Sequence, residues 1–258
     1  MQMRIVEKSA QGVRDQVSAD EWSTRIDLAA CYRLVAHYGW DDLIFTHISA
    51  RVPNTHDFLI NPYGLMFEEV TASNLVRVDL EGNQTLSSPY AINPAGFTIH
   101  SAIHAAREDA GCVLHLHTME GVAVSAQKGG LLPISQQATL VMLSLSYHDY
   151  EGLALNPDEK GRLQADLGDT RSMILRNHGL LTVGRTVPDA FMSMFTLQRA
   201  CEVQLLAQGN GAELVNIPQT VLDTVPEFSR MVTRGAGSAL VWPALLRKMD
   251  RLDTSYRN

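Results

Sequence analysis

The sequence predicts an α/β protein in which helices cover a mixed β-sheet. Segments with apolar residues at helical spacing alternate with short apolar runs bounded by turn residues, which is typical of a sheet covered by helices. The short runs follow one another closely, as in hairpins, so their spacing does not fit regular β-α-β units. The chain has 258 residues, of which 45% are hydrophobic, and this is enough for one large domain with its own core.

The first part of the chain is expected to form one helix followed by strands. Ser18 and Glu21 have the spacing of a capping box, and apolar residues recur at helical spacing up to Tyr38, just before Gly39. Turn residues then separate several short runs that we expect to form antiparallel strands. These runs are residues 44–46, 48–52, 58–60 and 75–78.

The rest of the chain alternates helices and strands. Asn93 as the cap and Pro94 in the first turn predict a helix up to about Arg107. We expect further strands at 112–117, 173–175 and 180–183, and helices at 118–127 and 189–208. The chain divides into an N-terminal arm, a main domain, and a C-terminal extension packed on the domain or on a neighbouring subunit: residues 1–17, 18–208 and 209–258.

Charge, the first residues and the cysteines indicate partners and location. With 21 basic and 28 acidic residues the net charge is -7, so we expect neither a nucleic-acid nor a membrane partner. The start of the chain has no apolar segment typical of a signal peptide, and no segment has the length of a membrane-spanning helix. Cys31, Cys112 and Cys201 form no C-x-x-C pair, which predicts reduced thiols and a cytoplasmic protein.

Two histidines alternate with apolar residues in the expected strand at 112–117. Because strand side chains alternate between faces, His115 and His117 point to one side, whereas Cys112, Leu114 and Leu116 face the core. Two imidazoles on one face, roughly 6–7 Å apart at their Cα atoms, can bind one divalent ion. The pattern equally fits two histidines that are hydrogen-bonded to neighbours on a polar face.

A third histidine follows the apolar run at 173–175. His178 precedes Gly179 and can complete a three-histidine site with an open position, which is the arrangement of catalytic metal sites. The alternative is a turn histidine beside a glycine that needs positive φ. His100 and His104 are four residues apart on an expected helix, but the glutamate of an H-E-x-x-H motif is missing. We therefore interpret them as structural histidines bonded to backbone or water.

Taken together, these segments resemble the class II aldolase/adducin family, and the adducin head domain in particular, from about Leu28 to about Leu206. The motifs that carry the resemblance are residues 93–107, His-Leu-His-Thr at 115–118, Leu131-Leu-Pro-Ile-Ser, Tyr147-His-Asp-Tyr and Arg176-Asn-His-Gly. The resemblance implies a three-layer α/β/α fold around a mixed, largely antiparallel sheet, and a homo-oligomer, either a tetramer or a dimer. It also implies a divalent ion, zinc in the first place and otherwise manganese, iron or cobalt, on His115, His117 and His178.

The chain departs from the family's sugar-phosphate aldolases at several positions. In those enzymes the metal stabilises an oxyanion, and a glutamate four residues before the position of His100 moves the proton. This chain has Gly96 at that position, and Pro94-Ala95 replaces a serine pair. The family's Gly-Asn-x-Ser stretch becomes Thr46-His47-Ile48-Ser49. A sugar phosphate is therefore not the expected substrate.

The sequence thus predicts a divalent-metal-dependent carbon–carbon lyase, an aldolase or a decarboxylase, that acts on a small non-phosphorylated hydroxy- or keto-acid. The candidates for acid–base catalysis are His47, Tyr63, Tyr147, His148 and Asp149. The candidates for substrate binding are Ser49, Gly64 and Asn93. The alternative is a non-catalytic adducin-like oligomerisation or binding module, cytoskeletal and actin-related in the family, with a vestigial metal site. We expect the enzyme because the chain ends at Asn258 without a lysine-rich tail.

Overall fold

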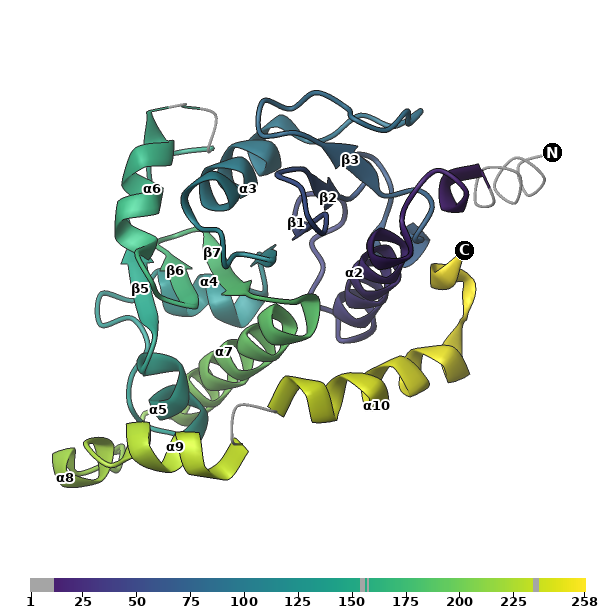
Figure 1. Ribbon diagram of the computed structural model, residues 1–258. Helices are drawn as coiled ribbons and strands as arrows, with labels where there is room; N and C mark the ends of the chain where they lie inside the picture. Colours follow the sequence, from purple (N-terminus) through teal and green to yellow (C-terminus); the bar gives the residue numbers. More distant parts are fainter. Residues whose placement is uncertain (1–11, 154–155, 157, 234–236) are drawn as a thin grey trace.

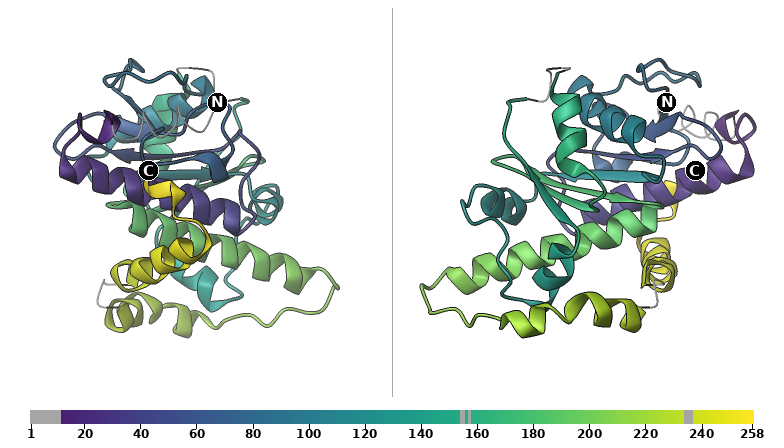
Figure 2. Two further views of the ribbon diagram at one scale, coloured as in Figure 1. Left: turned by 90° about the vertical axis from the view of Figure 1, so that its right-hand side faces the viewer. Right: turned by 60° about the vertical axis from the view of Figure 1, so that its left-hand side comes forward.

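A seven-stranded mixed sheet lies at the centre of the protein, between helices on both of its faces (Figure 1, Figure 2). The computed structural model describes residues 12–153, 156, 158–233 and 237–258, so the greater part of the expected arm at 1–17 lies outside the described residues. The strand order is β3-β2-β1-β4-β7-β6-β5. Strands β5 and β6 pair in parallel, and the other neighbours pair antiparallel. The expected α/β fold is confirmed.

The elements have the following bounds. The strands are β1 (His47–Arg51), β2 (Phe58–Ile60), β3 (Val76–Val78), β4 (Cys112–Leu116), β5 (Leu145–His148), β6 (Ser172–Leu175) and β7 (Gly179–Gly184). The longer helices are α2 (Ala19–His37), α3 (Pro94–Ala106), α6 (Glu159–Leu167), α7 (Val187–Gln208), α9 (Val225–Thr233) and α10 (Gly237–Leu252). The shorter ones are α4 (Met119–Ser125), α5 (Gln136–Met142), α8 (Gln219–Leu222) and the 3-10 helices η1 (Phe67–Glu69) and η2 (Ser255–Arg257).

The two faces of the sheet bury separate hydrophobic cores. On one face, Cys112, Leu114 and Leu116 of β4 join a core built with α2, α4, α5, α7 and α10. On the other face, Val113 packs with apolar residues of α3 and α6. The alternation expected for this strand therefore holds, and it places His115 on the same face as Val113. Figure 2 shows the two helical layers from the side.

Two local predictions were wrong, each for a physical reason. Residues 44–46 form no strand, because Leu43 has a φ of +50° and the N–H of Phe45 donates to the carbonyl of Asp42, which makes a turn. Ser18 caps α2 by accepting the N–H of Glu21, as expected, but the Glu21 carboxylate does not complete a capping box. It forms ion pairs with arginines of α2 and β3 instead.

The C-terminal segment adds to the main core. Trp242, Met249 and Tyr256 are buried in the core on the α2 and α7 face. The carbonyl of Tyr256 accepts a hydrogen bond from the N–H of Ala72 in the turn after η1. The segment contains the 16-residue helix α10. The division at residue 208 stays a prediction.

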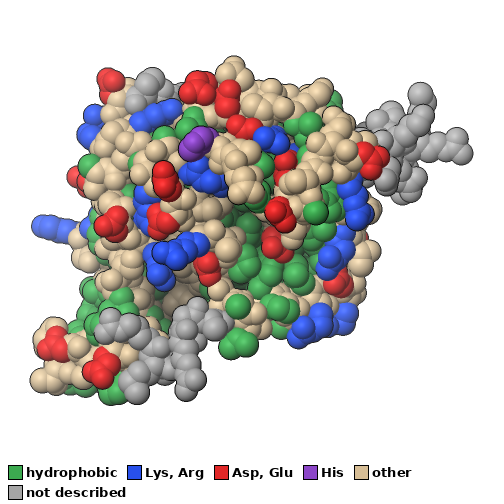
Figure 3. Space-filling model, in the orientation of Figure 1, with side chains coloured by type: hydrophobic (Ala, Val, Ile, Leu, Met, Phe, Trp, Pro, Cys, Tyr) green, Lys and Arg blue, Asp and Glu red, His purple; other side chains and the backbone are tan. Residues whose placement is uncertain are grey.

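The cysteines, the surface charges and the apolar helices also bear on the expectations from the sequence. All three cysteines are free and buried. On the face seen in Figure 3, acidic and basic side chains are interspersed. Within the described residues, no helix is both long and apolar enough to span a membrane.

Candidate metal centre

Three histidines meet at one end of the central strands. His115 lies near the end of β4, His117 follows the last residue of that strand, and His178 lies in the turn between β6 and β7. The centres of their rings are 4.7–4.9 Å apart. One ligand nitrogen of each ring lies within 4.8 Å of the other two. The structure therefore brings together the three residues that the sequence predicted as metal ligands.

A tight turn before β7 carries His178 to the end of β4. Asn177 has a φ of +55°, a left-handed conformation that asparagine tolerates better than most residues do. Gly179 begins β7, and a Cβ atom there would lie 2.5 Å from the carbonyl oxygen of Leu116. Glycine therefore lets β7 approach β4 closely enough for His178 to reach the other two histidines.

Hydrogen bonds determine which ring nitrogens are free. Nδ1 of His115 lies 3.1 Å from the carbonyl oxygen of Leu180, which can only accept, so this nitrogen carries the proton. Nδ1 of His117 lies 3.0 Å from Oδ2 of Asp42 and donates to that carboxylate. The Nε2 atoms of the two histidines then face each other 3.0 Å apart. Two lone pairs at this distance repel each other unless a proton or a cation lies between them.

The donor atoms fit a divalent ion. Tetrahedral zinc with bonds of about 2.0–2.1 Å holds its ligand atoms roughly 3.3 Å apart, which is close to the separation of the two Nε2 atoms. Burial, together with the neighbouring histidines, lowers the pKa of His115 well below its usual value. Burial, followed by His117 and His148, lowers the pKa of His178 to about 4. Both rings are therefore neutral at neutral pH and keep the lone pair that a metal needs.

Sequence comparisons identify the relatives of this chain. The profile of the Class II Aldolase and Adducin N-terminal domain matches residues 26–205. This chain belongs to the class II aldolase and adducin family. A Pseudomonas aeruginosa protein named after the class 2 aldolases is 61% identical over 258 residues, which cover 99% of this chain and 100% of that protein. Rat alpha-adducin is 48% identical over 195 residues, but these cover 73% of this chain and 26% of the adducin.

Solved structures agree with the assignment to the class II aldolases. An aldolase II superfamily protein from Pseudomonas syringae superposes with a TM-score of 0.90 at 52% identity, over 95% of this chain and 99% of that one. L-fuculose 1-phosphate aldolase from Glaciozyma antarctica PI12 superposes with a TM-score of 0.81 at 28% identity, over 93% of this chain and 94% of that one. The resemblance recognised in the sequence is therefore confirmed.

His47 is a fourth histidine near the cluster in this class II aldolase domain. It begins β1 opposite His115 of β4, and it is 3% exposed. Neither of its ring nitrogens has a hydrogen-bond partner among the described residues. Burial, and then the charges of His117 and His178, lower its pKa to about 4. A buried imidazole without partners next to a set of metal ligands is suited to contact a substrate.

Gly96 leaves the space that the His47 ring occupies. A Cβ atom at residue 96 would lie 2.5 Å from Cγ of His47 and 2.6 Å from its Cδ2 and Nδ1 atoms. The resemblance to the family's sugar-phosphate aldolases implies that their proton-moving glutamate corresponds to residue 96. In this chain an imidazole lies beside that position in place of a carboxylate.

Two of the predicted substrate-binding residues have partners within the protein. Ser49 is fully buried, and its hydroxyl oxygen lies 2.5 Å from Nδ1 of His100 and 2.8 Å from Nε2 of His104. Asn93 caps α3, since its side chain accepts the N–H of Ala95 at 3.0 Å. Their hydrogen bonds thus go to other described residues and not to His115, His117 or His178.

The remaining candidates lie in turns or around β5. Tyr63 and Gly64 follow β2 in an exposed turn, where Gly64 has a φ of +99°. The hydroxyl of Tyr147 accepts a backbone N–H, and its ring contacts a guanidinium group at 4.2 Å. Nδ1 of His148 lies 2.7 Å from a carboxylate oxygen of α6. Asp149 follows β5 and is exposed. Of the five acid–base candidates, His47 has the surroundings that suit the role best.

Two residues beside the cluster were not predicted. Asp42 binds His117, and the ring centre of Tyr150 lies 6.3 Å from that of His178. Tyr150 is half-exposed and belongs to the Tyr-His-Asp-Tyr segment whose other members were predicted, so a signal for it was present. Asp42 gave no signal, because it is 75 positions away from its partner and only the fold brings the two together.

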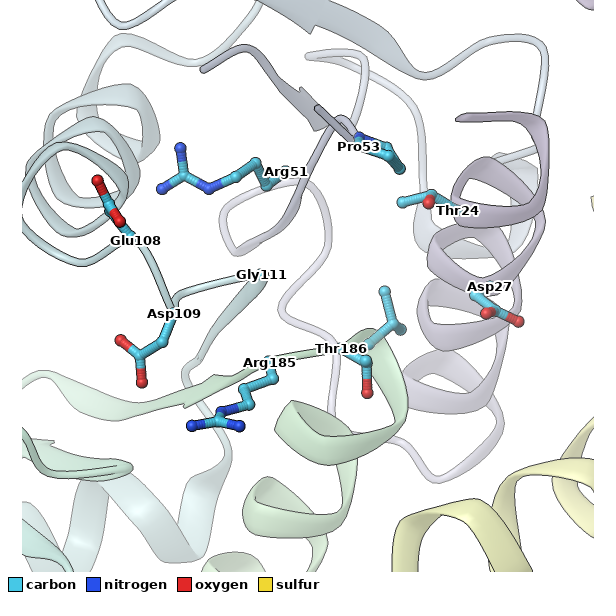
Figure 4. A pocket seen from close by; sticks show the side chains of 10 residues that line it. Thr24, Asp27, Arg51, Pro53, Glu108, Asp109, Gly111, Arg185 and Thr186 are labelled. Carbon is cyan, nitrogen blue, oxygen red and sulfur yellow. The ribbon is translucent and has the colours of Figure 1, made fainter. Parts of the chain in front are cut away.

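A cavity of about 540 Å³ lies at the opposite end of β1, β4 and β7 (Figure 4). Arg51 ends β1, Gly111 precedes β4 and Arg185 follows β7, whereas the histidines lie at the other ends of these strands. Glu108 and Asp109 line the same cavity as the two arginines, so its walls carry charges of both signs. This cavity is separate from the histidine cluster.

Proposed function

We propose that this chain is a divalent-metal-dependent carbon–carbon lyase, an aldolase or a decarboxylase, that acts on a small non-phosphorylated hydroxy- or keto-acid. The observation that carries the proposal is the pair of Nε2 lone pairs on His115 and His117, which face each other with His178 beside them. The similarity to an L-fuculose 1-phosphate aldolase at 28% identity supports the class of reaction.

Each residue of the cluster has a role in this proposal. His115, His117 and His178 hold the ion, zinc in the first place, with manganese, iron or cobalt as others that imidazole ligands accept. A bound divalent ion supplies Lewis acidity for the negative charge that develops on a substrate oxygen. Asp42 keeps His117 in the tautomer whose Nε2 is free. His47 gives or takes the proton that the substrate exchanges.

The proposal of a non-phosphorylated substrate rests on missing donors. Pro94 and Ala95 have no side-chain hydroxyl, and the hydroxyl of Ser49 is held between two histidines. Few groups are then left to bind a phosphate. We further propose a cytoplasmic homo-oligomer, a dimer or a tetramer, because the family often forms such assemblies and the three thiols are free.

The proposal is tested by measuring the metal content of the purified, untagged protein by plasma mass spectrometry. We expect about one ion per chain, and loss of most of it in the variant His115→Ala/His117→Ala. His56→Ala is the matched control, because His56 is exposed and has no place in the cluster. Hydroxy- and keto-acids are then screened for release of CO2 or an aldehyde. Full metal content in the double variant would overturn the site.

A second candidate function is a non-catalytic, adducin-like binding module. Its support is the 48% identity to rat alpha-adducin, which is higher than the 28% identity to the fuculose-phosphate aldolase. A protein that is purified without metal and does not take up added zinc, manganese or iron would favour this module. Metal uptake together with release of CO2 or an aldehyde would favour the lyase.

A further inference from the structure

A chain of hydrogen bonds fixes the tautomers of two buried histidines beside β1. Burial lowers the pKa of His104 to about 3, so this ring is neutral. Its Nδ1 lies 3.0 Å from the carbonyl oxygen of Ala110 and must carry the proton. Its Nε2 therefore accepts the hydroxyl proton of Ser49. Because Ser49 has no second proton, its oxygen accepts from Nδ1 of His100. Burial lowers the pKa of His100 well below its usual value, so this ring is also neutral and its Nε2 keeps a lone pair.

Three buried nitrogens around this point have no hydrogen-bond partner within the described part of the chain. They are Nε2 of His100 and both ring nitrogens of His47, with the two residues 0% and 3% exposed. The ring centres of His47 and His100 are 6.0 Å apart, and the ring planes are at 85°. Buried polar atoms are nearly always hydrogen-bonded in folded proteins, so the pair calls for a small polar group between them. His47 also faces His115 across β1 and β4, so this group borders the metal centre.

We infer that His47 and His100 bind one uncharged hydroxyl group of the substrate next to the three-histidine cluster. The hydroxyl donates its proton to Nε2 of His100 and accepts an N–H of His47, whose nitrogens are both unengaged. Hydrogen bonds of about 2.8 Å from both rings can meet at one oxygen atom placed at an angle between them. A carboxylate or phosphate oxygen has no proton to donate and meets the lone pair of His100 unfavourably.

The inference rests on the proposed function, in which the metal centre binds the acid end of the substrate. It defines the substrate class more narrowly. The metal centre takes the acid and its adjacent oxygen, and the two imidazoles take a second hydroxyl on a neighbouring carbon. The substrate is then a small polyhydroxylated acid of the sugar-acid type. An acid of the same length without that hydroxyl leaves both imidazoles without a partner and binds less tightly.

The tautomer is tested first, because its result does not depend on metal or activity. Long-range proton–nitrogen NMR on the chain labelled at histidine distinguishes a ring nitrogen with a proton from one without. We expect His100 to be neutral, with a proton on Nδ1 and none on Nε2. Ser49→Ala should allow a proton on Nε2, because the donor chain is then broken. A proton on Nε2 of His100 in the unchanged protein would overturn the inference.

The hydroxyl is tested by binding of D- and L-glycerate against D- and L-lactate to the zinc-loaded protein, by calorimetry. The two acids share the hydroxy-acid end and differ by one hydroxyl. We expect the more tightly bound enantiomer of glycerate to have about tenfold higher affinity than lactate, because one hydrogen-bonded hydroxyl contributes a difference of about that size. His47→Ala should reduce this ratio to about one, and His56→Ala should leave it unchanged.

The outcomes separate this inference from the proposed function. Three results would overturn the hydroxyl site. The first is equal affinity of the unchanged protein for glycerate and lactate, and the second is binding of neither acid. The third is that the NMR signals of His47 and His100 do not change when glycerate is added. In the last case the space holds a water molecule only. The metal site is judged separately, by zinc content. It still holds if these samples contain normal zinc, and it is overturned if the variant His115→Ala/His117→Ala keeps its zinc.

Discussion

Replacing Gly96 with alanine tests whether the ring of His47 fills the space beside residue 96. The new Cβ atom would lie 2.5 Å from Cγ of His47, whereas carbon atoms in contact are about 3.5–4.0 Å apart. The ring must therefore move by roughly 1 Å, and overpacking of this kind costs about 1–3 kcal/mol. The higher helix propensity of alanine in α3 offsets up to about 1 kcal/mol of this. We expect Gly96→Ala to lower the free energy of unfolding by about 1–2 kcal/mol.

The assay is a double-mutant cycle followed by urea unfolding of the metal-free protein. In the His47→Ala background the ring is gone, so Gly96→Ala should be neutral or stabilise by up to about 1 kcal/mol. The coupling free energy between the two positions should then be about 1–3 kcal/mol. Gly161→Ala in α6 is the matched control, because a Cβ atom there meets nothing within 4 Å. Equal effects of Gly96→Ala in both backgrounds would refute the proposed contact.

Two further predictions concern the metal and pH. Asp42→Ala should weaken metal binding about 10–100-fold, since the carboxylate orients His117. Competition with a chelator measures the affinity for the metal. An unchanged affinity would show that Asp42 does not support the site. The lowered pKa values of His47 (about 4) and His104 (about 3) predict that the metal-free protein is most stable above pH 6.5. Because the unfolded chain binds these protons first, stability should fall as the pH drops from about 6.5 to 4, by roughly 3 kcal/mol from His47 alone. A flat urea-unfolding profile over this range would contradict the burial of these rings.

The elements that the sequence predicted well have strong local signals. Ser18 and Asn93 cap the helices that they were expected to cap, and the alternation from Cys112 to Leu116 gives the two faces of β4. The wrong strand at 44–46 depended on apolar residues alone, which cannot reveal that Leu43 adopts a positive φ. Helix α5 and helix α6 have short or weak periodic patterns, so tertiary packing determines them more than local preference does.

The candidate metal ligands could be predicted because each lies in or beside a recognisable strand. Spacing alone puts His115 and His117 on one side of β4, but it left the hydrogen-bonded alternative open. Hydrogen bonds to Leu180 and Asp42 orient the Nδ1 atoms of the two rings and thereby set the distance between their Nε2 atoms. These hydrogen bonds depend on the strand register and on Asp42, which lies 75 positions away from His117 in the sequence, so no local pattern predicts them. The same holds for the contact between His47 and residue 96.

The charge of the site favours an acid over a neutral sugar as the substrate. Imidazole ligands would not compensate the two charges of a divalent ion, and the Asp42 carboxylate is bonded to the outer nitrogen of His117. In a partly buried site, such a charge attracts an anion more strongly than it does in water. A neutral sugar offers the ion no negative charge. A carboxylate with hydroxyl groups on its neighbouring carbons supplies the charge to the ion and a proton to the lone pair of His100. Because of the same two requirements, an acid without the second hydroxyl should bind less tightly, which is why the comparison of glycerate with lactate tests the substrate class directly.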